Sequence, residues 1–75
     1  MELKDFIQKF AEQFEETAIE LFKAETVFKN LPEWSSLTAL SIIAMVDEEM
    51  EKRVTGADIR NSATIEDLYQ LVLSK

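Results

Sequence analysis

The chain has 75 residues, of which 47% are hydrophobic, so it can build one small core. It contains neither histidine nor cysteine, which excludes disulfides, thiolate metal sites and nucleophiles built on Ser–His or Cys–His pairs. Fifteen acidic and eight basic residues give a net charge of −7, which disfavours nucleic acids and anionic membranes as partners and favours proteins with basic patches.

The composition predicts an all-α fold. One glycine and one proline are too few for the many tight turns of an all-β fold, and Glu, Leu, Ala, Lys and Met are good helix formers. No long apolar run stands at the N-terminus, so we expect neither a signal peptide nor a membrane span. The sequence therefore predicts a cytoplasmic monomer, folded as a single domain over residues 1–75.

The first predicted helix is followed by a long connection. Apolar residues recur at helical spacing on one face, at Leu3, Phe6, Ile7, Phe10 and Phe14. The period is lost over residues 15–31, and Pro32 opposes a helix there. We expect this connection to contain one helical turn and to be fixed on the core by Val27, Phe28 and Leu31.

A second periodic run predicts the next helix. Its apolar positions have the same spacing, at Ala39, Ile42, Ile43, Val46 and Met50. Ser35 or Ser36 is the natural N-cap, since a serine oxygen can accept a bond from a free N–H group one turn later. The charged run 47–53 ends the helix, and Lys52 and Arg53 in its last turn would suit the helix dipole.

Two shorter elements complete the chain. Gly56 is expected to break the structure, and residues 57–61 are long enough only for a short helix. Thr64 and Asp67 resemble a capping box that opens a last helix, whose apolar face is Ile65, Leu68, Tyr69 and Val72. The prediction is a small four-helix bundle with three longer helices, one short helix and a long first loop. The expected core is Phe6, Phe10, Phe28, Ile43, Val46, Ile59, Ile65, Leu68 and Tyr69.

The residues offer little chemistry of their own. The acidic run at Asp47, Glu48, Glu49 and Glu51 lacks the alternating oxygen ligands and central glycine of a Ca²⁺ loop, so we expect a solvated helix face and no metal site. Catalysis by paired carboxylates would need a pocket that short helices rarely enclose. We therefore expect no catalytic residue, and an enzyme acting alone is disfavoured.

Four motifs in order resemble the acyl carrier proteins, over nearly the whole chain. The family's loop pattern is present at Thr26, Phe28 and Leu31, followed by Ser35-Ser36-Leu37. The acidic close to the family's second helix is present as Asp47-Glu48-Glu49-Met50, and its final Thr-Ile-x-x-Leu as Thr64, Ile65 and Leu68. No single motif is specific, but their order, their spacing and the chain's length and charge all agree with the family.

The resemblance implies a prosthetic group on Ser36. In this family the serine before the leucine carries 4′-phosphopantetheine through a phosphodiester, and acyl groups are held on its thiol as thioesters. A helix N-terminus favours a phosphate, and the arm would supply the thiol that the chain lacks. The family usually has Asp before this serine, where the chain has Ser35, so Ser35 is a second candidate. Because Leu37 follows Ser36 directly, we expect Ser36 to be the site.

The resemblance also makes the second helix the recognition surface. Leu37, Leu40 and Ala44 form a second apolar stripe, in which we expect Leu40 to be buried between helices and Leu37 to be the exposed contact. The acidic residues Asp47, Glu48 and Glu51 would steer basic patches of the phosphopantetheinyl transferase and of acyl-transferring and condensing enzymes.

Two other functions remain open from the sequence. One is a non-catalytic acidic adaptor that docks on a basic protein, with the serines acting only as helix caps. The other is a carrier for aminoacyl cargo instead of fatty-acid or polyketide intermediates. Loading with coenzyme A separates the adaptor from the carriers.

Overall fold

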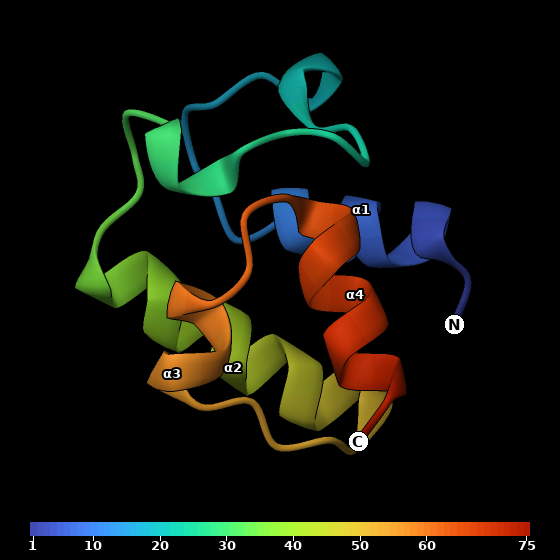
Figure 1. Ribbon diagram of the computed structural model, residues 1–75. Coiled ribbons are helices and arrows are strands. Elements are labelled where there is room, and N and C mark those ends of the chain that lie inside the picture. Colours follow the sequence, from blue (N-terminus) through green and yellow to red (C-terminus); the bar gives the residue numbers. More distant parts are fainter.

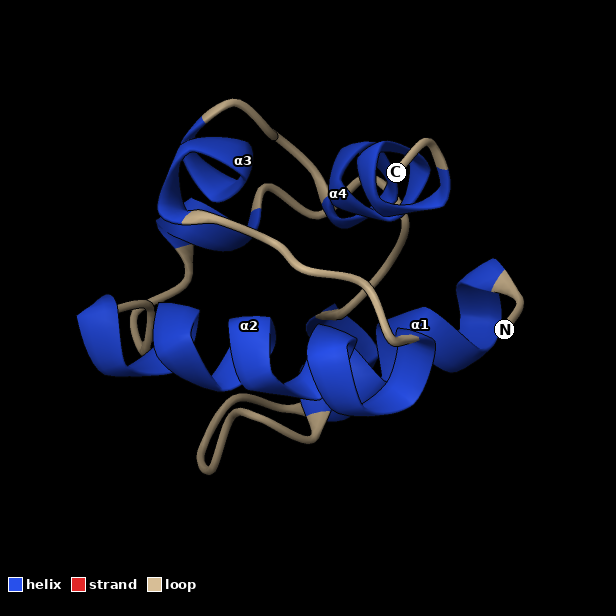
Figure 2. Ribbon diagram, turned by 90° about the horizontal axis from the view of Figure 1, so that it is seen from below, coloured by secondary structure: helices blue, strands red, loops and turns tan.

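Four α-helices and no strands make up the computed structural model, which describes residues 1–75. The helices are α1 (Leu3–Ala11), α2 (Ser36–Met50), α3 (Gly56–Arg60) and α4 (Ile65–Leu73). α3 has five residues and the others nine or more, which confirms the predicted small bundle with one short helix. α3 lies over α2 and α4 over α1 (Figure 1, Figure 2). None of these helices has both the length and the apolar character that crossing a membrane requires.

The first helix is shorter than its apolar pattern predicts. α1 ends at Ala11, and the chain then turns through hydrogen bonds from Gln13 N to Phe10 O (3.1 Å) and from Phe14 N to Ala11 O (3.0 Å). Phe14 is still buried, because its ring packs on those of Phe10 (centroids 5.7 Å apart) and Phe22 (4.9 Å). Tertiary packing on the connection, and not the helical period, determines where Phe14 lies.

The long connection over residues 12–35 is present, but it holds two 3₁₀ turns where one helical turn was expected. These are η1 (Ile19–Leu21) and η2 (Phe28–Asn30). The connection crosses the upper part of Figure 1 (blue to green) before it enters α2. Its last residues lie beside the first turn of α2.

The connection is fixed to the rest of the molecule by apolar packing and by hydrogen bonds. Phe28 is fully buried and Leu31 half-buried, as expected, whereas Val27 is 42% exposed, so its predicted role as an anchor is wrong. Two carbonyl groups of the connection also accept hydrogen bonds from the start of α4. Thr26 O accepts one from Ile65 N (3.1 Å), and Ala24 O accepts one from Glu66 N (3.0 Å). Because the first N–H groups of a helix lack partners within it, these carbonyls cap α4.

A single cluster of 15 buried residues forms the core, and six of them are aromatic. Of the residues expected inside, all are buried except Ile43, which is half-buried. Ile43 turns partly toward a surface hollow beside α2. The core also contains Phe22, Met45 and Val54, which the apolar periodicity of the sequence did not predict.

The end of α2 differs from the prediction. The helix ends at Met50, and Glu51 takes a left-handed conformation (φ 54°) that stops it. Lys52 and Arg53 therefore lie beyond the helix, and their predicted place in its last turn is wrong. A left-handed residue at this position is usually glycine or asparagine, so the sequence carried no signal for this end.

The caps of α3 and α4 follow from short side chains. Thr64 Oγ1 accepts a bond from Asp67 N (3.1 Å) and Asp67 Oδ2 accepts one from Thr64 N (3.1 Å), which confirms the predicted capping box. Thr55 and Asp58 make the same pair of bonds at α3. Gly56 is consequently the first residue of α3, and its expected role as a break is wrong.

Candidate functional site

Two adjacent serines begin α2, and they differ in what their hydroxyl groups bond. Ser35 is the N-cap: its Oγ accepts a hydrogen bond from Thr38 N (3.3 Å) and lies 3.2 Å from Thr38 Oγ1. Ser36 is the first residue of the helix, is exposed, and makes no side-chain hydrogen bond. The sequence left open which serine caps α2. In the structure the cap engages Ser35 and leaves the Ser36 hydroxyl free at a helix end whose first N–H groups are unpaired.

The residue Glu33 holds the segment before these serines in place. Its carboxylate accepts hydrogen bonds from the N–H groups of Glu15 (3.1 Å) and Glu16 (2.9 Å) and from Thr17 Oγ1. The bond from Thr17, together with the backbone N–H donors, lowers the pKa of the Glu33 carboxyl below its ordinary value of 4.5. On its other side Glu33 O accepts a bond from Thr38 Oγ1 (2.8 Å). Glu33 thus links the chain after α1 to the first turn of α2.

The ring of Trp34 provides the apolar support for the same segment. It is half-buried, meets the Phe28 ring edge-on (centroids 5.0 Å apart) and stacks on Phe14 (6.5 Å). Such contacts between aromatic rings stabilise the fold by more than the burial of their surface area alone would. The two residues immediately before Ser35 are therefore held by hydrogen bonds and by packing, and the serines that follow them stand at a defined position.

An open hollow of about 390 Å³ adjoins Ser36. It lies between the end of the connection, the first turn of α2 and α3, and it is lined by Lys29, Trp34, Ser35, Ser36, Ala39, Gly56, Ile59 and Arg60. Lys29 Nζ donates hydrogen bonds to the carbonyl oxygens of Ile59 (3.3 Å) and Arg60 (2.9 Å) at the end of α3. These bonds fasten η2 to α3 across the hollow.

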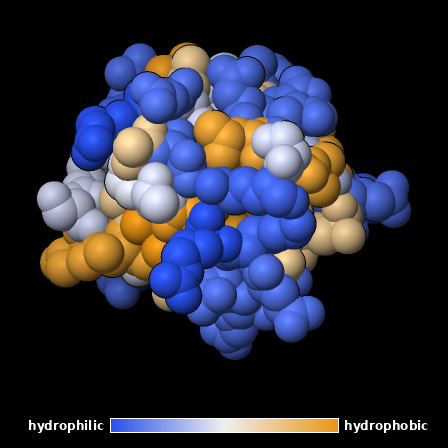
Figure 3. All heavy atoms as spheres, turned by 60° about the horizontal axis from the view of Figure 1, so that its bottom comes forward, coloured by the Kyte–Doolittle hydropathy of each residue, from blue (hydrophilic) through white to orange (hydrophobic).

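The second apolar stripe of α2 faces solvent. Leu37 is 76% exposed and Leu40 60% exposed, and Ala44 is exposed as well. The expected burial of Leu40 is wrong, because α2 meets the core through Ile42, and Leu40 points about 200° away from that residue around the helix. On the side of the molecule that α2 and α3 form, Figure 3 shows apolar surface among hydrophilic side chains.

A second open hollow, of about 380 Å³, lies along this stripe. It is lined by Leu40, Ile43, Ala44, Asp47, Arg53, Val54 and Thr55. Apolar side chains of α2 thus stand beside one carboxylate and one guanidinium. The hollow is a surface on which another protein could place an apolar side chain.

The acidic residues expected to steer partners lie beside the apolar stripe of α2 and just beyond the end of the helix. Asp47 lines the hollow beside Leu40, Glu48 lines a different hollow between α1 and α2, and Glu51 follows the end of the helix. All three are exposed. The structure therefore brings both Asp47 and Glu48 next to Ala44 of the apolar stripe, one on each side of it.

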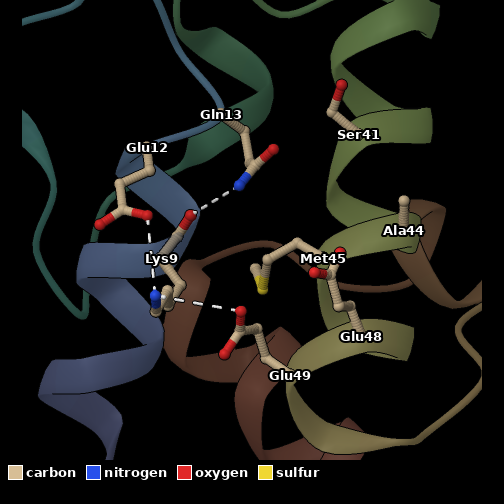
Figure 4. A pocket seen from close by; sticks show the side chains of 8 residues that line it. All are labelled: Lys9, Glu12, Gln13, Ser41, Ala44, Met45, Glu48 and Glu49. Atoms are coloured by element: carbon tan, nitrogen blue, oxygen red, sulfur yellow. Dashed lines mark hydrogen bonds and ion pairs between the residues drawn. The ribbon is translucent and has the colours of Figure 1, made fainter.

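The hollow between α1 and α2, of about 340 Å³, is mostly polar (Figure 4). Lys9 Nζ of α1 lies 3.9 Å from Glu12 Oε1 and 3.9 Å from Glu49 Oε2 of α2, and Gln13 Nε2 donates a hydrogen bond to Lys9 O (3.1 Å). Glu48 lines the α2 side. Long ion pairs at partly exposed positions contribute little to stability. We therefore interpret this hollow as a solvated groove between the two helices.

Comparison with known proteins finds no family model, no curated protein and no solved structure that matches the chain. The functional interpretation therefore depends on the residues around Ser36.

Proposed function

We propose that the chain is a carrier protein that holds acyl intermediates as thioesters on a 4′-phosphopantetheine arm attached to Ser36 Oγ. The observation that carries the proposal is the difference between the two serines: the Ser35 oxygen caps α2, whereas the Ser36 hydroxyl is exposed and unbonded. The resemblance of the loop and helix motifs to acyl carrier proteins supports the same residue.

The surroundings of Ser36 suit a phosphodiester. The free N–H groups and the dipole at the start of α2 favour a negative group, and the adjoining hollow gives the arm room beside its attachment point. In the loading step the Ser36 oxygen forms a bond to the phosphorus next to pantetheine in coenzyme A. The pyrophosphate bond breaks, the nucleotide leaves, and a base of the loading enzyme takes the hydroxyl proton.

The chain itself acts as a scaffold in this proposal. It has no cysteine, so the thiol that carries the acyl group comes from the arm when the arm is attached. Glu33 and Trp34 keep the attachment point in place. The partners are a phosphopantetheinyl transferase and acyl-transferring and condensing enzymes of fatty-acid or polyketide synthesis. They would dock on the exposed Leu37 and Leu40, with Asp47 meeting a basic residue.

Intact-mass measurement tests the proposal. The protein is incubated with coenzyme A, Mg²⁺ and a broad-specificity phosphopantetheinyl transferase. We expect one added phosphopantetheine on the wild type and none on Ser36→Ala. The matched control is Ser35→Asn, which removes the neighbouring hydroxyl but keeps an N-cap side chain, and we expect it to be loaded.

Three other outcomes would change the interpretation. An unchanged mass with several transferases would leave the acidic adaptor as the better interpretation, since the exposed Leu37 and Leu40 would serve it equally well. Loading of Ser36→Ala but not of Ser35→Asn would move the attachment to Ser35. A loaded protein that accepts only aminoacyl groups would make it an aminoacyl carrier.

A further inference from the structure

Two cations without carboxylate partners lie beside Ser36 in a chain of net charge −7. Lys29 and Arg60 both line the hollow that adjoins Ser36, and neither takes part in any of the three ion pairs of the molecule. The other cations outside the ion pairs, Lys4, Lys23, Lys52 and Arg53, do not line this hollow. This hollow is therefore the place near the proposed attachment point where an anion would be held.

Lys29 is positioned before any ligand arrives. It is half-buried, and its Nζ uses two of its three donors on the carbonyl groups of Ile59 and Arg60, which leaves one donor free. The Arg60 side chain folds back along α3, so that its Nη1 lies 3.5 Å from where a Cβ atom on Gly56 would stand. Side chains that are already ordered lose less entropy when they bind a ligand.

We propose that Lys29 and Arg60 bind the phosphodiester of the arm on Ser36 and thereby direct the arm into the hollow between α2 and α3. This inference rests on the proposed attachment. The phosphate is bonded directly to Ser36 Oγ and stays beside the hollow, whereas the cargo lies at the far end of the arm. The methyl groups that follow the phosphate in pantetheine meet an apolar wall of the same hollow, formed by Trp34, Ala39 and Ile59.

The contact is weak enough to release. Charge pairs at partly exposed positions are individually modest and are screened by salt. Removal of one cation is expected to lower the ratio of held to free arm by about 1.4-fold to fivefold. A carrier needs such a contact, because partner enzymes must draw the arm out again.

The test uses loaded protein and compares the only two arginines of the chain. Arg60→Gln removes a cation of the hollow and keeps the Lys29 bonds to α3, which involve only carbonyl groups. Arg53→Gln is the matched control, since Arg53 lies at the other hollow. The ³¹P chemical shift and transverse relaxation of the phosphodiester are measured at low and high salt. The variant Lys29→Gln/Arg60→Gln is added if circular dichroism shows that it folds.

In the wild type and in Arg53→Gln we expect the ³¹P resonance to shift with salt and to relax fast at low salt. In Arg60→Gln the salt-dependent shift and the fast relaxation should both be smaller, in line with a drop of about 1.4-fold to fivefold in the ratio of held to free arm. Equal ³¹P behaviour in all variants, or an equal loss in Arg53→Gln, would overturn the inference. Absence of loading in the wild type would instead defeat the proposed function. If Arg60→Gln resists loading, the Arg60 Nε–Hε resonance of the wild type is compared between apo and loaded protein. An unchanged chemical shift of this resonance would overturn the inference.

Discussion

Replacing Ser35 by alanine should weaken the fold without blocking the attachment site. The substitution removes one N-cap bond, from Thr38 N to Ser35 Oγ, whose length of 3.3 Å is at the long end of the usual range. Thr38 Oγ1 keeps its bond to Glu33 O, so no side-chain hydroxyl is left without a partner. Capping serines contribute about 0.5–2 kcal/mol. The long bond places this one at about 0.5–1 kcal/mol, or roughly 2–8 °C in the melting temperature of a domain of this size.

Thermal unfolding followed by circular dichroism measures this effect. Ser36→Ala is the matched comparison, because Ser36 is exposed, makes no side-chain bond, and its replacement should change stability by less than about 0.5 kcal/mol. Loading should show the opposite pattern, with Ser35→Ala loaded and Ser36→Ala not. If Ser36→Ala lowered the melting temperature and Ser35→Ala left it unchanged, the assignment of the cap to Ser35 would be refuted.

Three further predictions follow from other residues. The pKa of the Glu33 carboxyl is lowered in the folded state, so its contribution to stability is complete above the ordinary pKa of 4.5 and is lost as the pH falls through the folded pKa. Acid titrations of unfolding, monitored by fluorescence, should therefore show a shallower loss of stability for Glu33→Gln than for the wild type. Identical titration curves would contradict this. Gly56 has no positive φ and a Cβ there would meet only Arg60 Nη1 at 3.5 Å, so Gly56→Ala should raise the free energy of unfolding by about 0.4–1 kcal/mol in urea titrations, whereas a loss would show strain. Joint replacement of Asp47, Glu48 and Glu51 by Lys should slow loading about tenfold at low salt and less at high salt with the circular dichroism spectrum unchanged; loading at an unaltered rate would rule out acidic docking.

The helices could be predicted because their signals are local. Apolar spacing located α1, α2 and α4, and the Thr64–Asp67 pair marked the start of α4. The ends were harder. α1 stops early because Phe14 packs on rings of the connection, and α2 stops at Glu51 although that residue is not a glycine. Both ends depend on tertiary contacts or on a conformation that sequence spacing does not encode.

The site was predictable only in part. The motif around Ser36 is contiguous, so the sequence could point to it, but either serine could have served as the cap. The exposure of Leu40 depends on which residue of α2 faces the core, and the hollow beside Ser36 joins Lys29 to Arg60 across 31 positions. No periodic pattern links residues so far apart. That hollow is formed by residues of α2 and α3 together, and α3 lies over α2 (Figure 1).

The most direct measurement is peptide-level mass spectrometry of the protein purified from its native host. Digestion and fragmentation would locate any phosphopantetheine within the Ser35–Leu37 segment at single-residue resolution. A carrier with the geometry described here should hold the group on Ser36, with Ser35 bare. Detection of the group on Ser35, or of only the unmodified peptide in actively growing cells, would contradict the account.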